Sequence, residues 1–175
     1  SITTNGVINV FANGTGEVLA GGAVGNFTNI VNSGTISANA NATNGNADAD
    51  GVRANNIGNF TNSGTISANA NANATNRNVW VFGVNTAHNI DNFTNTGTIS
   101  ATLNANLTQN IAWSRGVQAW DDIGNFTNNG TISANVNATN GHAWAAGVFG
   151  GDHTLPNFDD KIGNFTNNGI ISTTA

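Results

Sequence analysis

Residues 57–67 read IGNFTNSGTIS, and the same phrase returns along the rest of the chain. It reads IDNFTNTGTIS at 90–100, IGNFTNNGTIS at 123–133 and IGNFTNNGIIS at 162–172. An earlier copy spans 24–37, where VGNFTN and SGTIS are separated by a three-residue insertion at 30–32. The phenylalanines of these copies are 33, 33, 33 and 39 residues apart. Repetition at a fixed period of this size is typical of proteins built from stacked repeats.

The pattern inside each repeat favours strands over helices. In TISANA at 65–70 the apolar residues occupy every second position, which is the alternation of a strand with one buried face. A second strand is predicted over VWVFGV at 79–84. The 36 Asn, 22 Gly and 22 Thr residues are poor helix formers. We therefore predict an all-β chain with one domain over 1–175, a right-handed parallel β-helix (β-solenoid) of about five coils with about 33 residues each.

Stacking the coils places equivalent residues in columns along the axis, and four apolar columns are predicted to fill the core. They are Ile8, Ile36, Ile66, Ile99, Ile132 and Ile171; Phe27, Phe60, Phe93, Phe126 and Phe165; Val24, Ile57, Ile90, Ile123 and Ile162; and Val18, Val52, Val84, Val117 and Val148. Identical side chains at fixed spacing fill a narrow core without a large globule.

Two further columns are predicted at a corner of each coil. Asparagines at this corner should take a positive φ and bond their amides to one another: Asn29, Asn62, Asn95, Asn128 and Asn167. The glycines that follow should turn the chain with positive φ: Gly34, Gly64, Gly97, Gly130 and Gly169. We interpret both columns as structural.

Composition excludes several classes of protein. Without Cys the chain has no disulfide, no Cys-based zinc site and no thiol chemistry. A net charge of −5 with four Lys and Arg residues argues against nucleic acid as a partner, and no apolar run is long enough for a membrane helix. Asp121, Asp122, Asp152 and His153 suggest a cation site, but a solvated acidic edge is the favoured interpretation. We predict no catalytic residues, no cofactor and no metal site, and hence a protein that is not an enzyme.

The tryptophans are the candidate ligand surface. Trp80, Trp113 and Trp144 each lie four residues before the Val of their coil, so they should stack on three successive coils. Exposed indoles could hold sugar rings, whereas buried ones would fill a wider part of the core. Trp120, beside two aspartates, is a separate candidate for surface contact. The motif Thr-x-Ser recurs in successive coils, as at Thr65 and Ser67, and both side chains should point outward. Such arrays of hydroxyl side chains leave ice binding as a further alternative.

The NFTNSGTIS phrase, the Asn-rich coils and the missing Cys resemble the β-helical passenger repeats of bacterial autotransporters and filamentous-haemagglutinin-like surface proteins. The resemblance covers nearly the whole chain. It implies an extracellular role at the bacterial surface, in adhesion or fibre building, and it brings no catalytic residues. Ser1 in place of Met agrees with removal of a secretion signal.

The two ends of the chain suggest a function. Residues 1–16 and 162–175 carry no charged side chain, and 2–8 align with 165–171 at the same point of the repeat. Uncharged edge strands pair readily, so copies should stack head to tail through Ile2, Val7, Ile170 and Ile171. We expect a structural subunit of an extracellular filament for adhesion or biofilm scaffolding, with itself as the main partner. The alternative is a monomeric adhesin rod that binds glycans or a host surface through its tryptophans.

Overall fold

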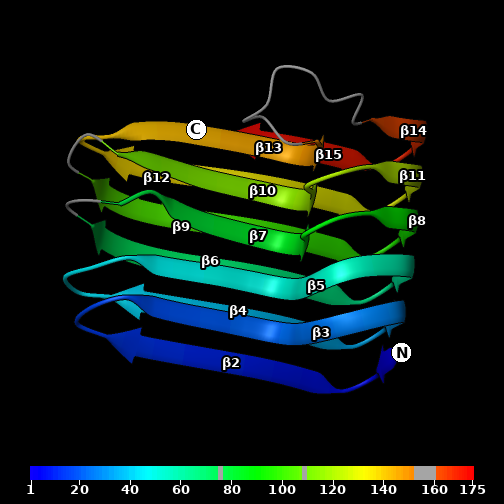
Figure 1. Cartoon of the computed structure of the whole chain (residues 1–175), viewed down its shortest axis with the longest axis horizontal. Helices are drawn as coiled ribbons and strands as arrows, with labels where there is room; N and C mark the ends of the chain where they lie inside the picture. Colours follow the sequence, from blue (N-terminus) through cyan, green and yellow to red (C-terminus); the bar gives the residue numbers. More distant parts are fainter. Residues whose placement is uncertain (75–76, 108–109, 152–160) are drawn as a thin grey trace.

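The computed structural model of the chain describes residues 1–74, 77–107, 110–151 and 161–175. These residues form strands and turns without a helix, so none of them belongs to a helix that could cross a membrane. The strands stack in parallel as a β-solenoid, which confirms the predicted all-β fold. Figure 1 shows the coils stacked from the N-terminal coil to the C-terminal coil.

The solenoid makes about four turns with a spacing of about 33 residues. Corner asparagines of successive coils are 30, 33, 33 and 39 residues apart. A shorter first step of 28 residues joins Asn5 to Ser33. The predicted five coils therefore correspond to about four turns near the regular spacing and one shorter turn at the N-terminus.

Each coil has three faces. Within the described residues, a six-stranded sheet forms the first face, from β2 (Val7–Gly14), β4 (Thr35–Ala42), β6 (Thr65–Ala74), β9 (Thr98–Leu107), β12 (Thr131–Thr139) and β15 (Ile170–Thr174). The second face holds the first parts of β3 (Val18–Asn32) and β5 (Ala47–Asn62), then β7 (Val79–Thr86), β10 (Ile111–Ala119) and β13 (His142–Gly150). The third face holds β1 (Ile2–Thr4), the ends of β3 and β5, then β8 (Ile90–Asn95), β11 (Ile123–Asn128) and β14 (Ile162–Asn167).

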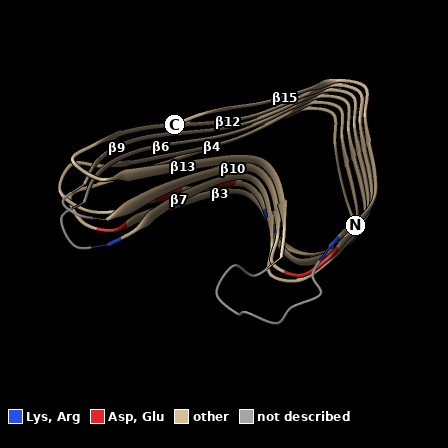
Figure 2. Ribbon diagram, turned by 90° about the horizontal axis from the view of Figure 1, so that it is seen from above, with Lys and Arg blue, Asp and Glu red and all other residues tan. Residues whose placement is uncertain are grey.

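Seen along the stack, the coils superimpose into one bent outline with a narrow arm and a wider arm (Figure 2). The strands of the second face bend at a column of glycines, where Gly51 and the following Val52 both face the core. A Cβ on Gly83 of this column would lie 2.5 Å from Cγ2 of Ile99. Glycine therefore lets the second face approach the isoleucines of the first face, and the bend makes the outer surface concave.

The core has two parts that match the two arms. One cluster is rich in alanine, including Ala38, Ala68 and Ala101, which lets two sheets pack closely in the narrow arm. The other holds the stacked phenylalanines and isoleucines of the wider arm. The Phe60, Phe93 and Phe126 rings stack with centroids 4.7 and 4.8 Å apart, and each ring is 1% exposed. The Ile8-to-Ile171 column is confirmed, because β2, β4, β6, β9, β12 and β15 pair in that register.

The register of the first coil was predicted wrongly. Phe27 pairs with Ile57, and Ile30 takes the place in the phenylalanine column below Phe60. Asn29 likewise pairs with Asn59, whereas Asn32 lies at the corner below Asn62. The turn decides this register, because the corner asparagine must directly precede the Ser-Gly turn. The extra residues of this coil are therefore accommodated earlier in β3, where the pairing shifts between Gly25 and Phe27.

Two members of the other apolar columns are also corrected. Val24 pairs with Arg53, and its side chain points outward and is 63% exposed. The reason is that Val24 precedes the shift in pairing between Gly25 and Phe27. Val18 is buried but pairs with Ala47, so Ala23 is the residue that stacks on Val52. From the second coil onward, Val52, Val84, Val117 and Val148 stack as predicted.

The corner is built by hydrogen bonds and close approach, not by positive φ. Each corner Nδ2 donates to the Oδ1 of the next asparagine, from Asn32 through Asn62, Asn95 and Asn128 to Asn167, at 2.7–2.8 Å. Among the described residues only Asn140 and Gly151 have a positive φ, so the predicted conformation was wrong. Gly97 is needed instead because a Cβ there would lie 2.1 Å from the carbonyl oxygen of Gly64.

Candidate functional site

The concave side of the bend carries the most varied side chains of the described chain. Three outward columns cross it: Leu19, Asp48, Trp80, Trp113 and Trp144; Gly21, Asp50, Phe82, Arg115 and Ala146; and Val24, Arg53, Asn85, Gln118 and Phe149. On the first face, by contrast, one outward column repeats threonine in its inner coils, at Thr35, Thr65, Thr98 and Thr131. Variation within a repeat protein marks positions that stacking does not fix.

Three neighbouring hollows cross this face along the strand direction. The middle one, of about 540 Å³, is lined by Asp48, Asp50, Trp80 and Trp120 among others. A hollow of about 470 Å³ beside it shares Arg53, Asn85 and Trp120 with the middle one. On the other side a hollow of about 450 Å³ shares Glu17, Asp48 and Trp80. Together they form one groove, which we call the concave groove.

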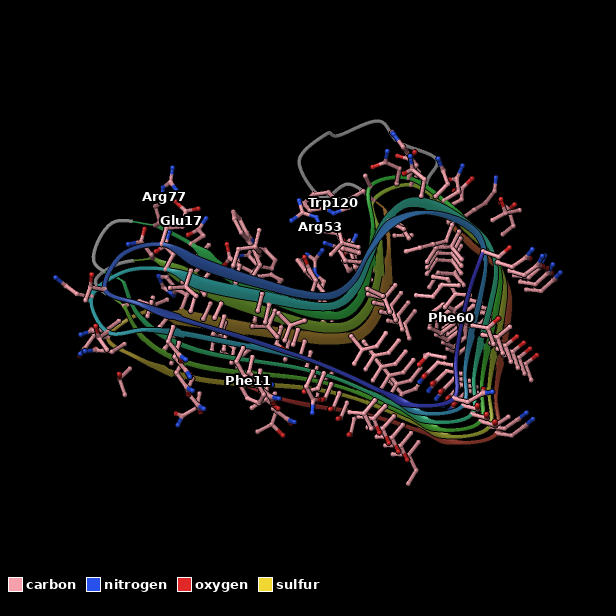
Figure 3. The ribbon with its side chains drawn as sticks, turned by 90° about the horizontal axis from the view of Figure 1, so that it is seen from below. Phe11, Glu17, Arg53, Phe60, Arg77 and Trp120 are labelled. Carbon is pink, nitrogen blue, oxygen red and sulfur yellow. The ribbon has the colours of Figure 1, made fainter. Side chains whose placement is uncertain are left out.

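Side chains from four successive coils meet in the concave groove. Figure 3 shows Arg53 and Trp120 in the hollow of the bend, with Glu17 and Arg77 farther along the same side. Phe60 lies inside the wider arm and Phe11 on the opposite face. The groove thus runs across the rod, over the first coils of the stack.

Two carboxyls form the floor of the middle hollow, because Asp48 and Asp50 point outward from the same strand, β5. Asp50 is 4% exposed, and its carboxylate lies 3.6 Å from Nη1 of Arg53 and accepts a hydrogen bond from Nδ2 of Asn85 at 3.4 Å. Burial raises the pKa of Asp50 to about 7, although the Arg53 charge and the Asn85 amide act in the opposite direction. Asp50 therefore changes charge near neutral pH.

Asp48 precedes Trp80 in the same outward column. Its Oδ1 accepts the backbone N–H of Trp80 at 2.9 Å. Burial raises the pKa of Asp48, and the hydrogen bond from Trp80 partly offsets this effect. At the far end, Nη1 of Arg77 lies 2.9 Å from Oε2 of Glu17, in an exposed ion pair. The groove therefore offers hydrogen-bond acceptors in its middle and a charged pair at one end.

The opposite end of the groove lies at the turn into the third face. Nδ1 of His88 lies 3.0 Å from Oδ2 of Asp121, and both side chains are about half exposed. Trp120 precedes this aspartate and is partly exposed. The guanidinium of Arg53 is also half exposed, so it can contact a ligand while it faces Asp50.

The tryptophans stack as predicted, but they do not share one role. Trp80, Trp113 and Trp144 pair in register on β7, β10 and β13. Trp80 is 39% exposed and Trp144 is 59% exposed. Trp113 lies between them, with its ring 5.3 Å from that of Trp144 and the Arg115 guanidinium 5.0 Å from its centroid. Trp113 and Arg115 therefore pack the wall, whereas Trp80 lines the groove.

Arg115 belongs to that wall and not to the ligand surface. It is 3% exposed, lies 4.0 Å from the ring centroid of Phe149, and donates a hydrogen bond to Oε1 of Gln118. Burial lowers the pKa of Arg115 to about 10, so it keeps its charge at neutral pH. The two aromatic rings stabilise the buried charge of Arg115 through cation–π contacts.

Sequence reasoning found Trp80 and Trp120 but missed Asp48, Asp50, Arg53 and Asn85. A signal for them was present, because they interrupt columns that hold other residue types in neighbouring coils. The suggested cation site of Asp121, Asp122, Asp152 and His153 is not tested by the structure. Asp152 and His153 lie outside the described residues, and no group of three or more His, Asp or Glu side chains within the described ranges could hold a metal ion.

The chain matches no protein-family model, and no similar curated protein or solved structure was found.

Proposed function

We propose that this protein is an extracellular β-solenoid that binds an extended carbohydrate chain across its concave groove. The observation that carries the proposal is the row of three joined hollows, which alternates indole surface with carboxylate, guanidinium and amide groups. The extracellular location rests on the resemblance of the repeats to bacterial surface β-helices. The proposal is for binding without catalysis, as the composition led us to expect.

The chemistry of the groove suits sugars. A sugar ring has an apolar C–H face and a rim of hydroxyls, so its sites combine an aromatic surface with hydrogen-bonding groups. In the middle hollow Trp80 supplies the surface, and Asp48, Arg53 and Asn85 supply acceptors and donors. Hydrogen bonds to charged groups are the stronger ones.

The size of the groove suits several sugar units. Each hollow falls within the usual range of ligand sites, about 300–1,000 Å³, and neighbouring hollows share lining residues. A chain of repeating units would therefore occupy successive hollows. Most residues that line the middle hollow lie in β-strands, which hold their side chains in place without a ligand and so reduce the ordering cost of binding.

Titration of oligosaccharides tests the proposal. Cellohexaose, the hexamer of N-acetylglucosamine and hexagalacturonate would be added while tryptophan fluorescence and binding heat are measured. We expect at least one to bind, and we expect Trp80→Ala to weaken its binding at least about tenfold, or 1.4 kcal/mol.

The matched control is Trp144→Ala. Trp144 is more exposed than Trp80 and lies in the same column, but it lines none of the three hollows. This variant should bind as the natural chain does. The proposal is wrong if no oligosaccharide binds, if Trp80→Ala binds unchanged, or if both variants lose affinity equally. Unchanged far-ultraviolet circular dichroism would show that each variant folds.

A further inference from the structure

The middle hollow of the concave groove carries more negative than positive side chains. Among the described residues, the carboxyls of Glu17, Asp48 and Asp50 line it against the one guanidinium of Arg53. The hollow on the Glu17 side adds a second guanidinium, that of Arg77, but this group is paired with Glu17 at 2.9 Å. Asp48 and Asp50 therefore share Arg53 as their main basic neighbour.

The contact between Arg53 and Asp50 leaves the carboxyl poorly satisfied. Nη1 of Arg53 and Oδ2 of Asp50 are 3.6 Å apart, which is longer than an N–H···O hydrogen bond. The side chain of Arg53 is 51% exposed, whereas that of Asp50 is 6% exposed, so the carboxyl has lost far more water than the cation that faces it. The other partner of Asp50, Nδ2 of Asn85, is 3.4 Å away. Asp50 is thus a buried carboxyl with long contacts.

Both carboxyls of β5 titrate as groups that lack positive charge around them. Burial raises the pKa of Asp48 and of Asp50, and the Arg53 charge does not offset the effect on either one. The charge of Glu17 raises the pKa of Asp48 further, and that of Arg77 has the smallest effect on it. An additional positive group in the hollow would stabilise both ionised carboxyls.

The remaining charged side chain on the neighbouring strands does not supply that positive group. Arg115, on β10, lies between the rings of Trp113 and Phe149 and lines none of the three hollows. The outward residues of β3 and β7 beside Asp50 are uncharged, being Gly21 and Phe82.

Asn85 adds a third acceptor to the middle hollow. Its Nδ2 donates to Asp50, whereas its Oδ1 is buried and accepts no hydrogen bond within the described chain. Asn85 lines both the middle hollow and the hollow on the Trp120 side. Buried acceptors without a donor are rare in folded proteins. The unmade hydrogen bond therefore indicates a donor that comes from a ligand.

An aromatic side chain stands next to these acceptors. Trp80 lines the middle hollow together with Asp48, and its backbone N–H donates to that carboxyl at 2.9 Å. Trp80 is 39% exposed, so a ligand can reach its ring. The face of an indole attracts cations, and the attraction grows where water is partly excluded. A positive group in this hollow would meet carboxylates, an amide oxygen and an aromatic ring.

We propose that the concave groove selects a cationic sugar chain, one whose units carry a free amine, as in a polymer of glucosamine. The inference rests on the proposed carbohydrate binding and names the chemical class of the ligand. The ammonium group of a bound unit lies in the middle hollow near Asp48 and Asp50, and the same unit donates a hydrogen bond to Oδ1 of Asn85. Its ring packs on Trp80.

Neutral and anionic chains suit these groups less well. A neutral chain brings no positive charge to the two carboxyls, and its hydrogen bonds lack the added strength of a charged donor. A uronate chain would bring carboxylates close to Asp48 and Asp50, and like charges repel. Arg53 is the one basic side chain in the described lining of the middle hollow, and it already faces Asp50.

A matched pair of ligands tests the proposal. The hexamer of glucosamine and the hexamer of N-acetylglucosamine share one backbone and differ in the charge of their amino groups. Cellohexaose and hexagalacturonate provide a second neutral chain and an anionic one. Binding heat and tryptophan fluorescence would be measured for all four at neutral pH. We expect the glucosamine hexamer to bind at least about tenfold more tightly than the N-acetylated hexamer.

Two variants test whether this preference arises in the middle hollow. Asp50→Asn removes one carboxyl from the hollow, and Asp91→Asn removes one at a position that lines none of the three hollows. The preference for the glucosamine hexamer should fall at least about fivefold in Asp50→Asn and should remain in Asp91→Asn. Far-ultraviolet circular dichroism would confirm that both variants fold.

The possible outcomes separate this inference from the proposed function. Carbohydrate binding stands and the inference is overturned if the N-acetylated hexamer, cellohexaose or hexagalacturonate binds as tightly as the glucosamine hexamer. The inference is also overturned if the preference persists in Asp50→Asn, or if it falls equally in Asp91→Asn, which would assign it to the net charge of the chain. If none of the four oligosaccharides binds, the proposed function and the inference are both wrong.

Discussion

The six-stranded first face and the concave second face are built from the same repeat, yet they differ in what the repeat preserves. On the first face, inward Ile and outward Thr recur from coil to coil in one register. On the second face the inward Val column persists from the second coil onward, but the outward residues change from Asp48 to Trp80 and from Arg53 to Asn85.

The difference separates positions that stacking fixes from positions that stacking leaves free to vary. Every coil must offer its neighbour the same inward shape, so inward columns repeat on both faces. Outward positions are not bound by that demand, and the threonines Thr35, Thr65, Thr98 and Thr131 line none of the three hollows of the concave groove. The outward columns of the concave face therefore hold different side chains in successive coils.

The largest expected effect sharpens this contrast in the core. Replacing Phe93 by Ala removes the middle ring of a stack whose neighbours lie 4.7 and 4.8 Å away. We expect the free energy of unfolding to fall by about 3–5 kcal/mol, as for other buried aromatics. Urea denaturation would measure it. Phe11→Ala is the control, because Phe11 is 68% exposed, and an equal loss there would contradict the assignment of the columns.

A second prediction concerns a buried carboxyl of the concave face. Because burial raises the pKa of Asp50 to about 7, the folded chain holds a proton there that the unfolded chain releases above about pH 3.8. Stability should therefore fall as the pH rises from about 4 to about 7, by about 2–4 kcal/mol, and should stay level above that window.

Urea denaturation at a series of pH values would measure this dependence. Asp50→Asn should flatten the curve and raise stability at pH 8 relative to the natural chain, because the neutral amide is not penalised by burial. Asp121→Asn removes a half-exposed carboxyl and leaves the buried one in place, so it is the matched control, and the fall in stability assigned to Asp50 should remain in this variant. A curve for Asp50→Asn as steep as the natural one would assign the effect to another group.

The smallest expected effect concerns the corner. Gly97→Ala places a Cβ 2.1 Å from the Gly64 carbonyl oxygen, so neighbouring coils must separate locally. We expect a loss of about 1–3 kcal/mol, typical of overpacking. Gly6→Ala occupies the same turn in the first coil, where nothing lies within 4 Å of the added Cβ, and it should cost little. Thermal unfolding of the two variants would show whether the loss of stability comes from the close approach of neighbouring coils or from alanine being unfavourable in this turn in general.

The fold could be predicted from the sequence because its main signals are local and repeated. Alternation in TISANA defines a strand, and recurrence at about 33 residues defines a stack. The columns of Phe60, Phe93 and Phe126 follow from counting alone. Counting failed in the first coil, because an insertion there allows two registers. Only the position of the Ser-Gly turn decides that Ile30, and not Phe27, stacks on Phe60.

The sequence alone thus determined the all-β class, the parallel stacking and most inward columns, because identical residues at a fixed spacing can satisfy one another only when coils repeat. It did not determine the bend at Gly51 and Gly83, since the reason for those glycines is the isoleucines of a different face. The tertiary structure also decided the groove. Asp48, Trp80 and Trp120 are far apart in the chain, and they line one hollow only because the bend makes the second face concave and the stack brings three coils side by side.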